Sequence, residues 1–204
     1  MKKQYHREIT SKALGLFFHQ QALDEIIVAN LEQDALRYQV AHDHFHYDSN
    51  SFAAGDAYCK EQRHLTLTAV QDGRASEARQ AFGRLTHTVQ DLYAHSNYVA
   101  LWREENPGIL PDGIDPESAF VLQNARLHSG KLYYPLEALS FIPVLNSFML
   151  PLLPKDSHAW MNLDDPGRPG FDFALAAAIK RTRSEYEQLA GHFSKQEVSV
   201  LTGK

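Results

Sequence analysis

The chain has 204 residues, of which 44% are hydrophobic, enough for one domain with a buried core and short for two. Its formal net charge of -5 and pI near 6.1 argue against binding of duplex DNA through a broad basic surface. The single cysteine, Cys59, excludes an internal disulfide and a cysteine-rich zinc site. Any bound metal must therefore be held by His, Asp and Glu, and the 11 histidines are a first indication of such a site.

Apolar residues at helical spacing predict helices over about 5–19, 23–38, 57–70, 75–103 and 171–193, with a partly helical stretch near Glu117. Stretches rich in Gly, Pro, Asp and Asn predict loops over 39–56, 105–118 and 155–170. No alternating strand pattern and no repeat is present. We therefore expect an all-α protein, a single multi-helix bundle over residues 1–204.

Two further segments bear on the location of the protein. No apolar run of signal-peptide length follows the basic start "MKKQYHREIT", so we expect a cytoplasmic protein. The most apolar stretch, residues 132–154, is interrupted by four prolines, Glu137 and Asn146. It predicts a pair of short core helices and no transmembrane segment.

The stretch "HTVQDLYAHSNY", residues 87–98, places His87, Asp91 and His95 four residues apart, which puts them on one face of the long helix. This face lies away from the helix's apolar stripe, which consists of Ala78, Phe82, Leu85, Val89 and Leu92. A solvent-exposed polar face is the simplest explanation. However, this face carries almost no Lys or Glu. The residues that share it are small or aromatic, namely Gly83, Ala94 and Tyr98.

A helix with such neighbours on both sides is expected to be buried, and a buried carboxylate between imidazoles needs a cationic partner. Imidazole nitrogen and carboxylate oxygen are zinc ligands, and i, i+4 spacing brings two of them to one ion. The pattern therefore predicts that this helix supplies ligands to a metal.

Further candidate ligands are spread over other segments. Asp34 shares a helix face with Asn30, and the loop that follows holds His42, His44 and His46. His6 stands at the head of the first helix, and His158 precedes "NLDD". Each also has a simpler explanation: His6 and His42 as surface residues, His158 as a loop histidine, and Asp34 as the surface partner of Arg37 or Lys60. We assign His19, His64, His128 and His192 to structural or surface positions.

Taken together, "HREITSKAL", "ANLEQD", "HFHYD", "LTHTVQDLYAHSNY" and "HAWMNLDDPG" resemble, in order and over most of the chain, the Het-C-like branch of the zinc-dependent phospholipase C and single-strand nuclease superfamily. The resemblance implies an all-α bundle with a buried cluster of two zinc ions, and up to three. Another divalent transition metal is compatible with the same ligands.

By resemblance, His87 and Asp91 are ligands from the long helix, and Asp91 bridges two metals. The remaining implied ligands are Asp34 and His46 for one of these metals, His6 for the other, and His95 and His158 for the third. His44 is the alternative to His46. Where the family has an acid after the last histidine, this chain has Asn162, with Asp164 or Asp165 as substitutes. The free amino-terminal amine that secreted members use as a ligand is expected to be missing.

The same resemblance implies a hydrolase in which metal-activated water attacks a phosphodiester or phospholipid, with Asp34 as ligand and general base. Its substrate would be a phosphoester small molecule, a lipid head group or a single-stranded nucleic acid. Two alternatives stand beside this function. His42 followed by Asp43 suggests an HD-type phosphohydrolase. A non-catalytic helical protein, stapled by metal and acting through partner contacts, is the other, because a metal stabilises a fold whether or not it catalyses.

Overall fold

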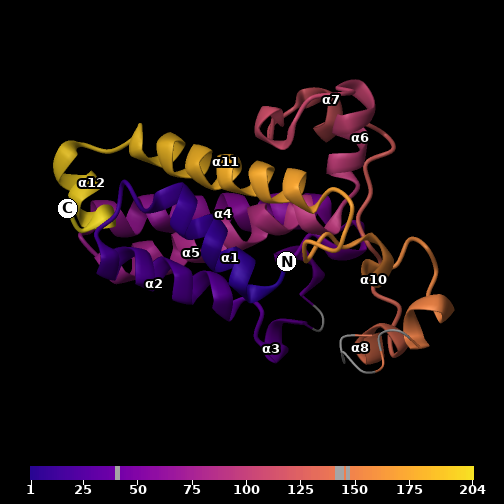
Figure 1. Cartoon of the computed structure of the whole chain (residues 1–204). Coiled ribbons are helices and arrows are strands. Elements are labelled where there is room, and N and C mark those ends of the chain that lie inside the picture. The colour runs from indigo at the N-terminus through magenta and orange to yellow at the C-terminus, as the bar shows by residue number, and fades with distance from the viewer. Residues whose placement is uncertain (40–41, 141–144, 146–147) are drawn as a thin grey trace.

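The computed structural model describes residues 1–39, 42–140, 145 and 148–204, and in this part all its regular elements are helices, with no strand (Figure 1). The elements in chain order are α1 (Lys3–Leu14), α2 (Gln20–Glu32), α3 (Leu36–Gln39), η1 (Asp43–Phe45), η2 (Asp48–Asn50), α4 (Phe52–Gln71), α5 (Ala75–His95), α6 (Tyr98–Glu105), η3 (Pro111–Gly113), α7 (Ala119–Leu122), α8 (Leu136–Ser140), η4 (Leu150–Leu152), α10 (His158–Met161), α11 (Phe171–Ala190) and α12 (Lys195–Thr202). The prediction of an all-α, multi-helix bundle is confirmed.

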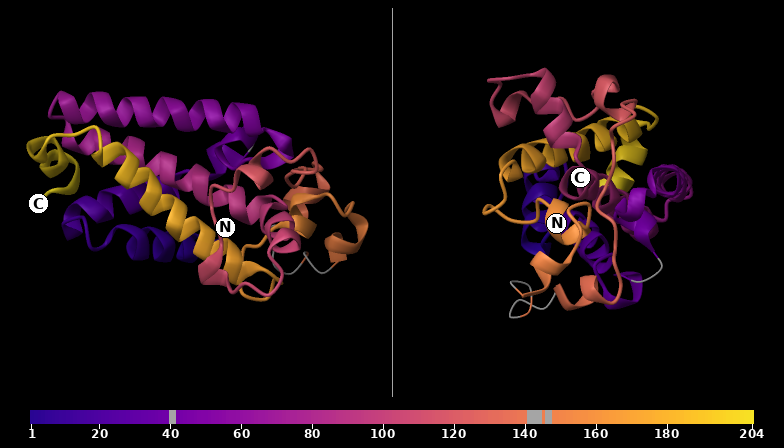
Figure 2. Two further views of the ribbon diagram at one scale, coloured as in Figure 1. Left: turned by 90° about the horizontal axis from the view of Figure 1, so that it is seen from above. Right: turned by 90° about the vertical axis from the view of Figure 1, so that its right-hand side faces the viewer.

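Helix α5 lies at the centre of the bundle. Helices α2, α4 and α11 pack along it, and α1 packs against α2 and α11 (Figure 2). Fully buried apolar side chains from these helices form the core, among them Ile9, Leu14, Ile26, Phe82 and Leu85. Burial of each large apolar side chain contributes about 1.5–3 kcal/mol to folding. Because α5 is covered on all sides, every side chain from Leu85 to His95 is buried, the polar ones included.

Helices α2 and α5 meet at a glycine. A Cβ atom on Gly83 would lie 2.4 Å from the carbonyl oxygen of Ile26 and 2.7 Å from the Cβ of Ala29. Only glycine therefore lets the two backbones approach this closely. The close approach sets the depth at which the polar residues of α5 face α2.

One end of α5 is covered by loops. The amide of Gly130 donates to the carbonyl oxygen of His95 at 2.9 Å, and that of Leu163 donates to Ala94 at 2.7 Å. These loop amides satisfy carbonyls that a helix end leaves unpaired. The amino terminus and α10 lie at this end of the bundle, and α12 lies at the other (Figures 1 and 2).

Several predicted boundaries need correction. The predicted helix 75–103 is two helices, because Ser96 is extended at φ -116° and ψ 170°. The predicted helix 23–38 is interrupted after Glu32, and α4 begins at Phe52 within the predicted loop 39–56. The predicted loop 155–170 contains α10, and α12 was not predicted.

Much of the apolar stretch 132–154 is exposed where the structure describes it, although Leu153 is buried. Phe148 is 68% and Leu152 64% exposed, and Leu136 and Leu139 are 38% exposed, so the expectation of two core helices is wrong for these side chains. Residues 141–144 and 146–147 of this stretch lie outside the described residues, as do Val40 and Ala41 of the predicted loop. Within the described part of the chain, no helix has the length and apolar character needed to cross a membrane.

Candidate metal centre

The polar face of α5 lies inside the protein. His87 and Asp91 are completely buried, and His95 is 5% exposed. The alternative of a solvent-exposed face is therefore wrong, and the prediction from the small and aromatic neighbours is confirmed. The four-residue spacing places all three side chains on one face of α5.

Asp91 is the centre of the cluster. Its Oδ2 atom lies 3.0 Å from both His46 Nδ1 and His87 Nε2. Its Oδ1 atom lies 3.2 Å from His6 Nε2 and 2.6 Å from the amine of Met1, a group that was not expected in the site. Burial alone would raise the pKa of Asp91, but His95, the amine and His87 hold it well below its ordinary value. Asp91 is therefore a carboxylate.

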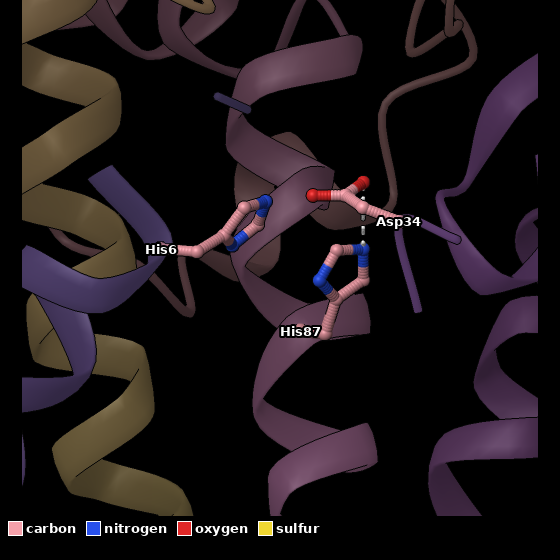
Figure 3. A group of neighbouring side chains, drawn as sticks. All are labelled: His6, Asp34 and His87. Carbon is pink, nitrogen blue, oxygen red and sulfur yellow. Dashed lines mark ion pairs between the residues drawn. The ribbon is translucent and has the colours of Figure 1, made fainter. Parts of the chain in front are cut away.

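Three chain segments meet beside Asp91. His6 comes from α1, Asp34 follows α2, and His87 comes from α5, and each offers a ligand atom within 4.8 Å of the others (Figure 3). His87 Nε2 lies 3.8 Å from Asp34 Oδ1, and the rings of His6 and His87 stack at 4.3 Å between centroids. His46, His87 and Asp91 form a second group of the same kind. His87 belongs to both groups, so the two positions adjoin.

A third group contains a residue that the sequence did not single out. Asp48, at the start of η2, joins His95 and His158. Asp48 Oδ1 lies 2.9 Å from His158 Nδ1 and 3.3 Å from His95 Nδ1. Burial favours a raised pKa for Asp48, but His158 and His95 hold the pKa well below its usual range. The "HYD" stretch contained this aspartate, two residues after His46, without any spacing rule to identify it.

The alternatives that the sequence left open lie at different positions in the structure. His46 is 4% exposed and enters the cluster, whereas His44 lies outside it beside Phe45 and Tyr58. Asp164 Oδ1 lies 3.4 Å from His95 Nε2. Asp165 instead pairs with Lys2 at the surface, and Asn162 donates to the carbonyl oxygens of His158 and Ala159. His42 and Asp43 are half-buried and belong to none of the three groups.

The donors fit a metal. Among the described residues, His6 Nε2, His46 Nε2 and His87 Nδ1 are buried nitrogen atoms that make no hydrogen bond. Of these, His6 Nε2 faces Asp91, whereas His46 and His87 face Asp91 with their other ring nitrogens, Nδ1 and Nε2. Burial lowers the pKa of His87 to about 4, so this imidazole is neutral near neutral pH and has a lone pair to give. Buried imidazole and carboxylate groups with unused lone pairs are the donor set that zinc takes.

A pocket of about 290 Å³ opens onto the cluster. The cluster residues that line it are Asp34, His46, Asp48, His95, His158 and Asp164. Lys2 and Lys3 stand at the same pocket. The pocket gives an ion a route from solvent to the three groups.

These features define a class of protein: an all-helical bundle with a histidine and aspartate cluster buried beside its central helix. The family model of the VWA7 N-terminal domain matches residues 5–119, more than half of the chain, and the chain belongs to this family.

Curated relatives carry the name von Willebrand factor A domain-containing protein 7. The rat (Rattus norvegicus) and mouse (Mus musculus) proteins are each 33% identical over 90 residues, 44% of this chain and 10% of the relative. The human (Homo sapiens) protein is 32% identical over 84 residues, 41% of this chain and 9% of the relative. The chain thus spans about a tenth of the length of these relatives. No solved structure matches the chain.

These matches correct the family prediction. The assignment to the Het-C-like branch of the zinc-dependent phospholipase C and single-strand nuclease superfamily is wrong, because the family model and the relatives are those of VWA7. The predicted hydrolysis of phosphodiesters or phospholipids is wrong for the same reason, as are the predicted substrates: phosphoester small molecules, lipid head groups and single-stranded nucleic acid. Short His and Asp motifs at helical spacing describe a way to hold a metal. Neither the family of a protein nor its reaction follows from such motifs. The predicted role of Asp34 as general base is wrong together with the hydrolase, and its role as a metal ligand stays a prediction.

Proposed function

We propose that this chain is a non-catalytic, metal-stapled helical module that acts through contacts with protein partners. The observation that supports it is the burial of Asp91 among His6, His46 and His87, which come from α1, the loop between η1 and η2, and α5. A buried carboxylate is costly unless a cation compensates its charge. A metal ion shared by Asp91 and the three imidazoles therefore stabilises their arrangement.

Zinc is the metal that fits best. The ligands are the residues predicted from the sequence, His6, Asp34, His46, His87, Asp91, His95 and His158, together with Asp48 and Asp164. His87 belongs to two adjoining groups, and Asp91 faces His6 with Oδ1 and His46 and His87 with Oδ2, which suits two ions. Asp48, His95 and His158 suit a third. A donor set of imidazole and carboxylate without thiolate also accepts other divalent transition metals.

A structural role for the metal agrees with what the relatives are. Their name records a von Willebrand factor A domain, and the matched segment is about a tenth of their length. A small module within such a long chain serves by holding its own shape and by presenting a surface to other domains or proteins. A bound metal contributes folding free energy for this purpose without any turnover.

The test is metal content and metal-dependent stability. We expect the purified protein to retain at least about one zinc per chain by elemental mass spectrometry, and chelation to lower its thermal midpoint. Restoring zinc at about 100 times its dissociation constant contributes roughly 2.7 kcal/mol to stability. Asp91→Asn removes the central carboxylate at constant volume and should abolish the response. Asp72→Asn should leave the response to zinc intact, because the Asp72 carboxylate pairs with Arg74 at the surface.

Two results would overturn the proposal. A protein that is metal-free after purification and whose thermal midpoint does not respond to added zinc has no metal staple. A zinc-loaded protein that hydrolyses a chromogenic phosphodiester, with loss of the activity on Asp91→Asn, is catalytic.

A further inference from the structure

A chain of buried polar side chains lies behind His6. Thr86 and Gln90 of α5 and Asn30 of α2 are at most 1% exposed, although none of them belongs to the three groups of candidate ligands. Gln90 Oε1 lies 2.7 Å from His6 Nδ1. Asn30 Nδ2 lies 3.0 Å from Thr86 Oγ1 and 3.2 Å from Gln90 Oε1. Buried polar groups of this kind are normally hydrogen-bonded, and in each hydrogen bond here the donor and the acceptor can be assigned.

The direction of each hydrogen bond follows from the helix backbone. The Thr86 hydroxyl donates its one proton to the carbonyl oxygen of Gly83 at 2.8 Å, so toward Asn30 it can only accept. Asn30 must therefore present its Nδ2, which is also the atom that faces Gln90. Gln90 must in turn present its oxygen.

The far side of Gln90 agrees with this orientation. Its Nε2 donates to the hydroxyl of Thr10 on α1 at 3.1 Å and to that of Thr182 on α11 at 3.0 Å. Both hydroxyls are completely buried. The amide is thus held at both ends by residues of α1, α2 and α11, and its oxygen is fixed toward His6.

An amide oxygen accepts and cannot donate, so the proton between His6 and Gln90 belongs to His6 Nδ1. In the neutral ring this leaves Nε2 with its lone pair. Nε2 lies 3.2 Å from Asp91 Oδ1 and, among the described residues, makes no hydrogen bond. A lone pair that faces a carboxylate oxygen is unfavourable by itself and favourable when a cation binds both.

We infer that Gln90 is a positioning residue for the metal, which holds His6 in the Nδ1–H form so that Nε2 is free to bind the ion. The inference rests on the proposed metal-binding function. Outer partners of this kind fix the tautomer and orientation of a ligand histidine, and their loss costs about 10- to 100-fold in metal affinity.

The first measurement does not need metal. In chelator-treated protein in mildly alkaline buffer, nitrogen-detected NMR of the imidazoles should report the Nδ1–H form for His6. Gln90→Met removes the acceptor at similar volume, and the nearby Asp91 carboxylate then favours a proton on Nε2. Gln90→Glu keeps an acceptor oxygen and should keep the Nδ1–H form.

The second measurement is zinc affinity by competition with a chromophoric chelator. Gln90→Met should weaken binding by about 10- to 100-fold, and Gln90→Glu should restore most of it. Gln62→Met is the matched control, since Gln62 is a buried glutamine of α4 that accepts from Arg84 and does not contact the cluster. It should alter stability without altering zinc affinity.

The results separate this inference from the proposed function. A wild-type His6 in the Nε2–H form, or an equal loss of affinity in Gln90→Met and Gln90→Glu, overturns the role of Gln90. A wild-type protein that binds no zinc while His6 is in the Nδ1–H form overturns the metal staple and leaves the assigned tautomer standing.

Discussion

Two neighbouring aspartates, Asp164 and Asp165, have opposite surroundings. Asp164 Oδ1 faces His95 Nε2 at 3.4 Å, whereas Asp165 pairs with the exposed Lys2 at 2.6 Å. We expect Asp164→Asn to weaken zinc binding by at least about tenfold and Asp165→Asn to leave it unchanged, because an exposed ion pair contributes little. Chelator competition on both variants measures the difference. Equal affinities for the two variants would remove Asp164 from the site.

At the same scale, the candidate ligands that periodicity in a sequence can predict are those on a regular helix. His87, Asp91 and His95 follow from a four-residue period alone. Asp48 and Asp164 follow from no period, because they stand in irregular segments whose course depends on contacts with distant residues. For the same reason burial, and not spacing, separates His46 from His44.

Between elements, the junction of α2 and α5 gives a prediction. Gly83→Ala places a methyl group 2.4 Å from a backbone oxygen of α2, which cannot move aside as a side chain can. We expect a loss of about 1–3 kcal/mol in the free energy of unfolding, as for other overpacked cores. Gly191→Ala is the control, because its added Cβ has no neighbour closer than 3.4 Å. Denaturant titration of both variants tests this, and similar stabilities would contradict it.

The elements themselves could be predicted where local signals exist. The central helix ends at His95 because loop amides from Leu163 and Gly130 reach its carbonyls, and no Gly or Pro marks the place. Helix α12, by contrast, has a local signal that was missed: Ser194 and Glu197 form a capping box. The exposure of apolar side chains in residues 132–154 could not be predicted. A run of apolar residues in a sequence does not show whether other parts of the chain pack against it.

Across the whole molecule, a buried ion pair joins α4 to α11. Glu185 is completely buried and accepts from Arg63 Nε at 2.6 Å and from Arg181 Nε at 2.8 Å. Burial alone would raise its pKa, but Arg63 and Arg181 hold the pKa below its ordinary value of 4.5. We expect Glu185→Gln to lower the free energy of unfolding by about 1–3 kcal/mol at neutral pH, because two partly buried guanidinium groups lose the charge of their buried carboxylate partner.

The pH dependence of this effect has a definite sign. Since the folded pKa of Glu185 is depressed, its contribution is fully present above the unfolded pKa, near 4.5, and is lost as the pH falls through the folded value. The stability difference between wild type and Glu185→Gln should therefore shrink in that acid range. Urea titrations of chelator-treated protein at decreasing pH measure it. A difference that is constant or that grows toward acid contradicts the assignment.

The metal staple also predicts which part of the molecule depends on the ion. Between η1 and α4, three residues that are not glycine have left-handed backbone: Tyr47, Ser49 and Asn50, with φ of 56°, 53° and 60°. Such conformations persist only where the surroundings enforce them. Here the anchors are His46 and Asp48 in the cluster and the bond from the Ser49 amide to Gly130 at 2.8 Å.

Chelation removes the anchor at the cluster, so the amides of residues 43–51 should exchange with solvent about tenfold faster or more by hydrogen-exchange mass spectrometry. Helix α12, at the other end of the bundle, should be unaffected because it is held through Arg79, which donates to the carbonyl oxygens of Val200 and Leu201. Asp91→Asn should show the fast exchange with or without zinc. An increase spread evenly over 43–51 and α12 would mean that the metal stabilises the fold as a whole, and no increase in 43–51 would mean that the loop is held without it.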